Sequence, residues 1–133
     1  MRFVLDASVT VTWALRDEDH PLADLAFSEL GLGSAIVPAI WWYEIRNVMI
    51  LNERRGRITT ADVSGFLLDL NEFSIRVEPP GDGEATLHLA RRFNLSFYDA
   101  AYLELAIRER IPLSTLDKAL QTAARAAGVS LLE

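Results

Sequence analysis

A chain of 133 residues with a formal net charge of −6 is long enough for one domain with a buried core and too short for two. It contains no cysteine, which excludes a disulfide framework, a thiolate metal site and a thiol nucleophile. Its two histidines, His20 and His88, have no partner at metal-ligand spacing, and we interpret both as surface or helix-end residues. We therefore expect a single acidic domain over residues 1–133.

The N-terminal segment Met1–Asp6 lacks the apolar core of a signal peptide, and no run of about 18 apolar residues follows it. We expect a cytoplasmic protein without a membrane partner. The acidic balance disfavours non-specific nucleic-acid binding by the whole surface, but it allows a local basic patch.

Strand and helix patterns alternate along the chain, with a charge-rich turn at 16–19 and apolar stripes at helical spacing elsewhere. In chain order, we predict a strand at 2–5, helices at 8–15 and 21–32, a strand at 35–37, a helix from Trp41 to near Gly56, a helix from Thr59 or Thr60 to Leu70, a strand at 74–77, helices at 82–93 and from Phe97, a strand at 111–114, a helix at 116–127 and a strand at 129–132. This alternation predicts an α/β fold with a mainly parallel central sheet of four to five strands and helices on both faces.

The segment from Leu95 to Ala106 places a carboxylate in an apolar helix. Ser96 is a typical N-cap, so we expect the helix to begin at Phe97 with Asp99 in its first turn. An unpaired ionised carboxylate on a buried helix is costly unless it is protonated or binds a cation. The spacing Ser96-x-x-Asp99 also fits a capping box, in which the acid only stabilises the helix N-terminus.

Three further acids are predicted at the same edge of the sheet. Asp6 directly follows the first strand, Glu44 lies on the helix after the second, and Asp117 follows the fourth. Sites in open parallel sheets form at the carboxyl ends of the strands, and the helix that begins near Asp99 leads into the fourth strand. Each acid alone also has a structural explanation, because helix starts and helix borders attract carboxylates.

Four carboxylates in one place, without lysine or histidine among them, would repel one another unless a hard divalent cation binds. We therefore predict a Mg²⁺ or Mn²⁺ site, and such ions serve phosphate chemistry by activating water and neutralising charge on the leaving oxygen. The hydroxyls of Ser8 and Thr115 could orient neighbouring carboxylates, although both also suit helix capping. The predicted metal ligands are Asp6, Glu44, Asp99 and Asp117.

Four segments are similar to the motifs of a known family. They are Asp6-Ala7-Ser8-Val9 with Trp13, Glu44 with Asn47, the run from Phe97 to Ala106, and Ser114-Thr115-Leu116-Asp117 with Leu120, Ala123, Ala124 and Gly128. The chain resembles the PIN-domain family between residues 3 and 131. More narrowly, it resembles the VapC-type toxins of prokaryotic toxin–antitoxin pairs.

The resemblance implies a three-layer α/β fold and a Mg²⁺- or Mn²⁺-dependent endoribonuclease that cleaves phosphodiester bonds with metal-activated water. It also implies a homodimer and inhibition by a cognate antitoxin whose tail lies across the acidic pocket. Carried over to this sequence, the catalytic and metal-binding residues would be Asp6, Glu44, Asp99 and Asp117, with Ser8 and Thr115 as supporting polar groups.

Contact with RNA is predicted from clustered arginines. Arg54, Arg55 and Arg57 stand at the end of the helix with Glu44, and they could track phosphates or complement the negative end of the helix dipole. Arg91 and Arg92 form a second small patch with the same two explanations.

Several aromatic residues also have two interpretations. Tyr98 and Tyr102 could stack on an RNA base, but their helical spacing favours the core. Trp41, Trp42 and Phe66 could serve a dimer or an antitoxin, or could equally belong to the core.

Other functions stay open at this point. A phosphoryl-transfer or receiver-type domain also has an aspartate after its first strand, but it needs a lysine after a later strand, and the only lysine here, Lys118, directly follows Asp117. A structure-specific DNA nuclease of the same family usually carries insertions for which this chain has no room. A non-catalytic binding module would keep the fold and bind no metal.

Overall fold

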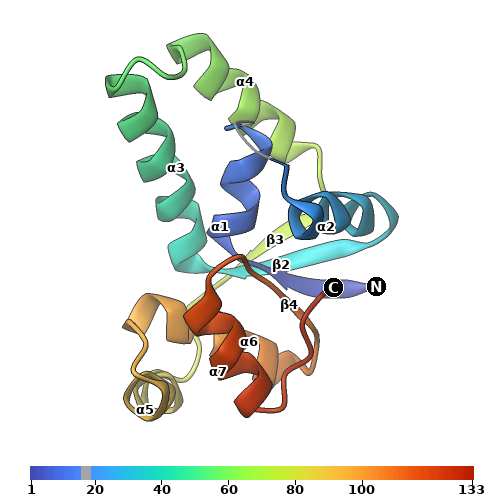
Figure 1. The fold of residues 1–133 in the computed structure, drawn as a ribbon, viewed down its shortest axis with the longest axis vertical. Helices are drawn as coiled ribbons and strands as arrows, with labels where there is room; N and C mark the ends of the chain where they lie inside the picture. The colour runs from blue at the N-terminus through green and yellow to red at the C-terminus, as the bar shows by residue number, and fades with distance from the viewer. Residues whose placement is uncertain (16–18) are drawn as a thin grey trace.

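The computed structural model describes residues 1–15 and 19–133, so most of the predicted turn at 16–19 lies outside the described residues. Parallel strands form the central sheet in the order β3-β2-β1-β4 (Figure 1). The strands are β1 (Arg2–Leu5), β2 (Ser34–Pro38), β3 (Ile75–Glu78) and β4 (Leu113–Ser114).

The strand order reverses beside β1. The chain runs outward from β1 to β2 and β3, then returns to place β4 on the other side of β1. Val4 therefore lies opposite Ile36 on one side and Leu113 on the other. Crevices at such a reversal, beyond the carboxyl ends of the strands, are the usual ligand sites of open α/β sheets.

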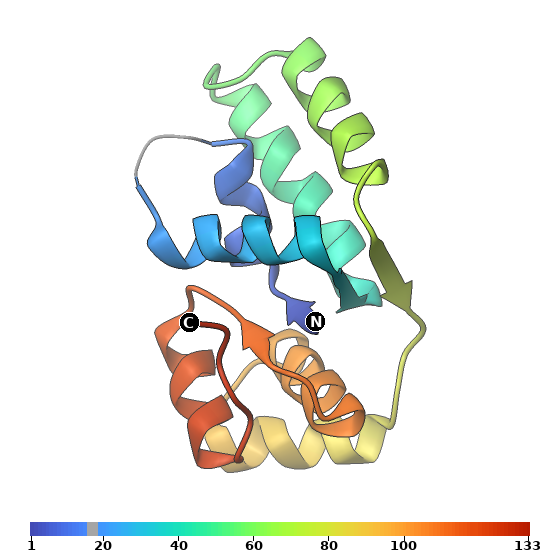
Figure 2. The same ribbon diagram turned by 90° about the vertical axis from the view of Figure 1, so that its right-hand side faces the viewer.

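Helices cover both faces of the sheet, as the two views show (Figures 1 and 2). One layer contains α1 (Ala7–Thr10), α2 (Pro21–Leu32), α3 (Ala39–Arg54) and α4 (Thr60–Asn71), and the other contains α5 (Gly83–Phe93), α6 (Phe97–Glu109) and α7 (Lys118–Ala126). The predicted three-layer α/β fold with a parallel sheet is confirmed. Among the described residues, no helix is long and apolar enough to cross a membrane.

The core lies between β1 and the two helical layers. Phe3, Val4 and Leu5 are completely buried, because β1 is paired on both edges and covered on both faces. Helix α6 crosses below the sheet with Tyr102 and Leu103 buried as well. Each such side chain stabilises the fold by about 1.5–3 kcal/mol through removal of apolar surface from water. The packing of β1 and α6 therefore fixes the positions of the residues at their ends.

Two sequence predictions of regular structure are wrong in detail. The helix expected at 8–15 is only α1, followed by a 3-10 turn over Val11–Trp13. This segment is rich in β-branched residues, and Thr12 bonds back to the carbonyl of Val9 at 2.7 Å, which disfavours a regular helix. The strand expected at 129–132 is reduced to one parallel bridge between Leu113 and Leu131.

The fourth strand is also shorter than predicted. Ile111 donates its N–H to the carbonyl of Ala106 at the end of α6, at 3.2 Å, and is therefore occupied by the end of that helix. Pro112 has no N–H to donate to a sheet. As a result β4 contains only Leu113 and Ser114.

Candidate active site

Asp6 lies at the carboxyl end of β1, at the reversal of strand order. It occupies the N-cap position of α1, yet its side chain does not cap that helix. Instead its Oδ2 atom accepts hydrogen bonds from Ser8 Oγ and Thr115 Oγ1, each at 2.7 Å. Thr115 directly follows β4, so the pairing of β1 with β4 brings together two residues that are 109 positions apart in the chain.

The protons of both hydroxyls are directed at Asp6. Ser8 Oγ accepts the N–H of Leu116 and Thr115 Oγ1 accepts the N–H of Asp117, both at 3.0 Å. A backbone N–H can only donate, so each hydroxyl keeps its single proton for the carboxylate. Two donors on Oδ2 favour the ionised form of Asp6, and the backbone N–H of Ala7 lowers the pKa of this carboxylate in the same direction.

Glu44 is half-buried on α3 and is bound to the opposite helical layer. The hydroxyl of Tyr102, on α6, donates to Glu44 Oε1 at 2.6 Å and accepts the N–H of Ala7 at 3.4 Å. Sequence reasoning placed Tyr102 in the core, which is right, but missed its bond to Glu44. A signal was available, because Tyr102 lies one turn after Asp99 on a buried face, where a phenol hydroxyl needs a polar partner.

Asp99 lies in the first turn of α6, where Ser96 caps the helix by accepting the Asp99 N–H at 3.0 Å. In a complete capping box the acid also accepts the N–H of the N-cap residue, as Asp62 does from Thr59 at 2.9 Å in α4. Within the described residues, Asp99 makes no such return bond to the Ser96 N–H. Its carboxylate is therefore not used as the second half of a capping box.

Asp117 is the N-cap of α7, and its Oδ1 accepts the N–H of Leu120 at 2.9 Å. Asp117 therefore stabilises the start of a helix, which is the structural explanation that the sequence allowed for it. Its remaining oxygen, like Oε2 of Glu44, has no hydrogen-bond partner in the described part of the chain. Each of these two carboxylates is fixed through one oxygen and has the other one available.

The acids influence one another electrostatically. Burial raises the pKa of Asp6, of Glu44 and of Asp99, and neighbouring carboxylates raise each further: Asp99 at Asp6, Asp6 and Asp99 at Glu44, and Asp117 at Asp99. Hydrogen bonds from hydroxyl groups oppose this effect at Asp6, at Glu44 and, from Ser96, at Asp99. In the described part of the chain, none of the four acids forms an ion pair with lysine or arginine. No positive charge in the described part of the chain therefore offsets their mutual repulsion.

No group of three or more Asp, Glu and His side chains within the described residues is placed to hold a metal ion by itself. Mg²⁺ keeps several water ligands and binds proteins through one or two carboxylates together with substrate phosphate oxygens. The all-oxygen donor set, with the available oxygens of Glu44 and Asp117, fits a partly hydrated cation of this kind. They do not form a closed protein cage.

The raised pKa values predict how the metal-free protein responds to pH. The folded state binds protons at Asp6, Glu44 and Asp99 more tightly than the unfolded chain, whose reference pKa values are 3.8 for Asp and 4.5 for Glu. Their contribution to the free energy of unfolding is therefore most favourable at low pH and is lost as the pH rises through the raised values.

Melting curves in chelator between about pH 4 and pH 8 test this expectation. The difference in melting temperature between an Asp99→Asn variant and the wild type should grow as the pH rises, because asparagine never acquires the disfavoured charge. A difference that stays constant with pH would contradict it.

The arginines predicted to contact RNA do not lie next to the acids. Arg54, Arg55 and Arg57 are exposed at the C-terminal end of α3 and in the turn after it, at the end of the molecule remote from the sheet (Figure 1). Along the helix axis Arg54 is roughly 15 Å from Glu44. Arg57 also donates to Asn52 Oδ1 at 3.4 Å.

The aromatic residues differ in burial, and the prediction for one of them is wrong. Tyr98 was expected in the core but is 58% exposed, because it points outward from the first turn of α6. Trp41 is buried, and its indole N–H donates to Thr10 Oγ1 at 3.0 Å. Phe66 packs partly buried against the core, whereas Trp42 is exposed.

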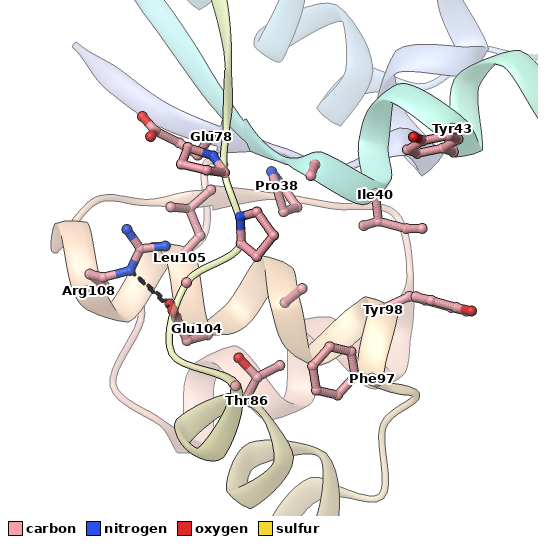
Figure 3. Close-up of a pocket in the computed structure, with 16 residues that line it drawn as sticks. Pro38, Ile40, Tyr43, Glu78, Thr86, Phe97, Tyr98, Glu104, Leu105 and Arg108 are labelled. Atoms are coloured by element: carbon pink, nitrogen blue, oxygen red, sulfur yellow. Dashed lines mark hydrogen bonds and ion pairs between the residues drawn. The ribbon is translucent and has the colours of Figure 1, made fainter.

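An apolar cavity of about 310 Å³ lies between the start of α3, the segment after β3 and α6 (Figure 3). Tyr43 and Tyr98 line it, and they are the chain neighbours of Glu44 and Asp99. Glu104 and Arg108 form an ion pair at another part of its wall, with Arg108 Nε 3.0 Å from Glu104 Oε2. None of the four predicted site acids, Asp6, Glu44, Asp99 and Asp117, lines this mainly apolar hollow.

A sequence model of the PIN domain matches residues 3–126. The chain belongs to the PIN-domain family. The resemblance based on its four motifs is thus confirmed. No curated protein sequence matches this PIN domain at a significant level.

Solved structures similar to this PIN domain include PAE2754 from Pyrobaculum aerophilum, with 23% identity and a TM-score of 0.75 over 99% of this chain and 84% of that one. VapC20 from Mycobacterium tuberculosis, described as a sarcin–ricin loop cleaving toxin, has 14% identity and a TM-score of 0.63 over 92% and 95% of the two chains. A toxin–antitoxin complex from Klebsiella pneumoniae has 16% identity and a TM-score of 0.57 over 85% and 83%. At these identities the likeness shows a shared fold.

Proposed function

We propose that this PIN domain is a metal-dependent endoribonuclease and the toxin of a type II toxin–antitoxin pair. The main support is the electrostatic coupling of four carboxylates at the reversal of strand order, with no lysine or arginine paired to them among the described residues. Such a group is suited to a hard divalent cation and, through it, to a phosphodiester. The description of VapC20 as a sarcin–ricin loop cleaving toxin and the toxin–antitoxin complex from Klebsiella pneumoniae support the same proposal.

The proposed cofactor is Mg²⁺ or Mn²⁺, held by Asp6, Glu44, Asp99 and Asp117. When bound, it would supply activation of water and neutralisation of charge on the leaving oxygen. The protein's own groups supply position. Ser8 and Thr115 hold Asp6 through Oδ2, and the α7 N-terminus holds Asp117 through Oδ1. The second oxygen of Asp117 stays available for the ion.

The proposed substrate is RNA, whose backbone the protein's net charge of −6 repels as a whole. Local positive charge must therefore guide the strand. Arg54, Arg55 and Arg57 are our candidates for phosphate contact. Because they lie far along α3 from Glu44, they would contact the strand away from the bond that is cut.

The proposed partners are a cognate antitoxin and a second copy of this chain, in the cytoplasm. Trp42, Tyr43, Phe97 and Tyr98 are all exposed, and each lies within two residues of Glu44 or Asp99 in the chain. Several exposed aromatic side chains in one region are typical of a surface that another protein covers. We therefore expect an antitoxin or a partner copy to bind close to the acids.

Cleavage of a pool of structured RNAs by the purified protein tests the proposed function. We expect discrete fragments with Mg²⁺ or Mn²⁺ and none with chelator, because the repelling carboxylates need the ion. Single-stranded and structured DNA are the matched controls. Cleavage of DNA alone would point to a DNA nuclease instead. Intact RNA and DNA, with no metal bound by calorimetry, would favour a binding module.

A further inference from the structure

Tyr102 connects three parts of the site through one hydroxyl group. Its side chain is completely buried on α6, its Oη donates to Glu44 Oε1 on α3 at 2.6 Å, and it accepts the N–H of Ala7 at 3.4 Å. Ala7 directly follows Asp6, so the same hydroxyl contacts the turn that positions Asp6. Asp99 lies one helical turn before Tyr102 on α6.

The direction of these bonds is determined. A phenol has one proton, and the Ala7 N–H can only donate, so the proton of Tyr102 goes to Glu44. Glu44 therefore has a donor on Oε1, and its Oε2 has no hydrogen-bond partner in the described part of the chain.

Glu44 needs such a bond to stay where it is. Asp6 and Asp99 both repel its carboxylate, and in the described residues no cation of the protein attracts it. Glu44 is only half-buried, and a glutamate has three rotatable side-chain bonds, so without a partner it would turn toward solvent. The short bond from Tyr102 opposes that movement.

From this geometry we infer that Tyr102 is a positioning residue, whose hydroxyl holds Glu44 among the other acids and presents its free oxygen to a divalent cation. This inference rests on the proposed metal-dependent function. Tyr102 acts through Glu44 in this inference. Its side chain is completely buried, so it does not contact RNA.

The test is a double-mutant cycle of Tyr102→Phe and Glu44→Gln, read by calorimetric titration with Mn²⁺ or Mg²⁺ and by thermal melting. Removal of a group that orients a metal ligand typically weakens metal affinity by about 10- to 100-fold. We expect Tyr102→Phe to weaken affinity by about tenfold or more in the wild-type background and by much less when Glu44 is already glutamine. Tyr98→Phe, an equal change at an exposed position of the same helix, should leave metal affinity unchanged.

Two results would overturn the inference: an unchanged metal affinity in Tyr102→Phe, or an equal loss of affinity in both backgrounds, which would indicate a general effect on the fold. Failure of the proposed cleavage alone looks different, because the wild-type protein would then bind the ion and show the expected coupling of Tyr102 to Glu44, yet leave RNA intact. A wild-type protein that binds neither Mn²⁺ nor Mg²⁺ would overturn both proposals.

Discussion

An Asp99→Asn variant is expected to lose metal-dependent RNA cleavage by roughly 100-fold or more, while it melts at the same or a higher temperature than the wild type. Activity falls because asparagine is a poor ligand for a hard cation. Stability is kept because burial and Asp117 raise the pKa of Asp99, so the folded metal-free protein disfavours the charge that the substitution removes. Cleavage rates with Mn²⁺ and melting curves in chelator measure the two effects.

Asp62→Asn is the matched control, because Asp62 occupies in α4 the helix position that Asp99 occupies in α6. Asp62 is exposed and completes a capping box with Thr59, so we expect a lower melting temperature and full cleavage. If Asp99→Asn behaves in the same way, with cleavage intact and a stability loss of at most about 1 kcal/mol, Asp99 is a capping residue only.

A Thr115→Val variant is expected to lose about 1–3 kcal/mol of stability and about 10- to 100-fold of cleavage activity. Valine keeps the shape of threonine but removes the buried hydroxyl that donates to Asp6 and accepts the N–H of Asp117. Both partners then lack a hydrogen bond, and Asp6 is held by Ser8 alone. Chemical denaturation and single-turnover cleavage at saturating Mn²⁺ measure the two losses.

Thr115→Ser is the control for this variant, because serine keeps the hydroxyl and removes only a methyl group. We expect it to retain most of the activity. Equal losses of cleavage in the valine and serine variants would contradict a role for the hydroxyl, and would indicate that packing of the threonine methyl group matters instead.

Much of the fold follows from local patterns. Thr59, Asp82 and Ser96 cap α4, α5 and α6 where the sequence indicates helix starts, since a cap depends on residues three positions apart. The buried run of β1 and the apolar character of α6 are equally visible, because burial on all sides removes the polar face. Where local signals conflict, as in the β-branched segment after Asp6, the predicted helix is too long.

The candidate site divides in the same way. The sequence by itself determined that Asp6, Asp99 and Asp117 stand at the ends of elements and that Glu44 lies on the helix after the second strand, because chain order and caps are local properties. Only the tertiary structure decided that β4 lies beside β1, which directs Thr115 to Asp6, and that α3 faces α6, which joins Tyr102 to Glu44 across 58 positions. Strand order and helix packing depend on how the whole core is filled. Neither can be predicted from the two-residue period of a strand or the 3.6-residue period of a helix.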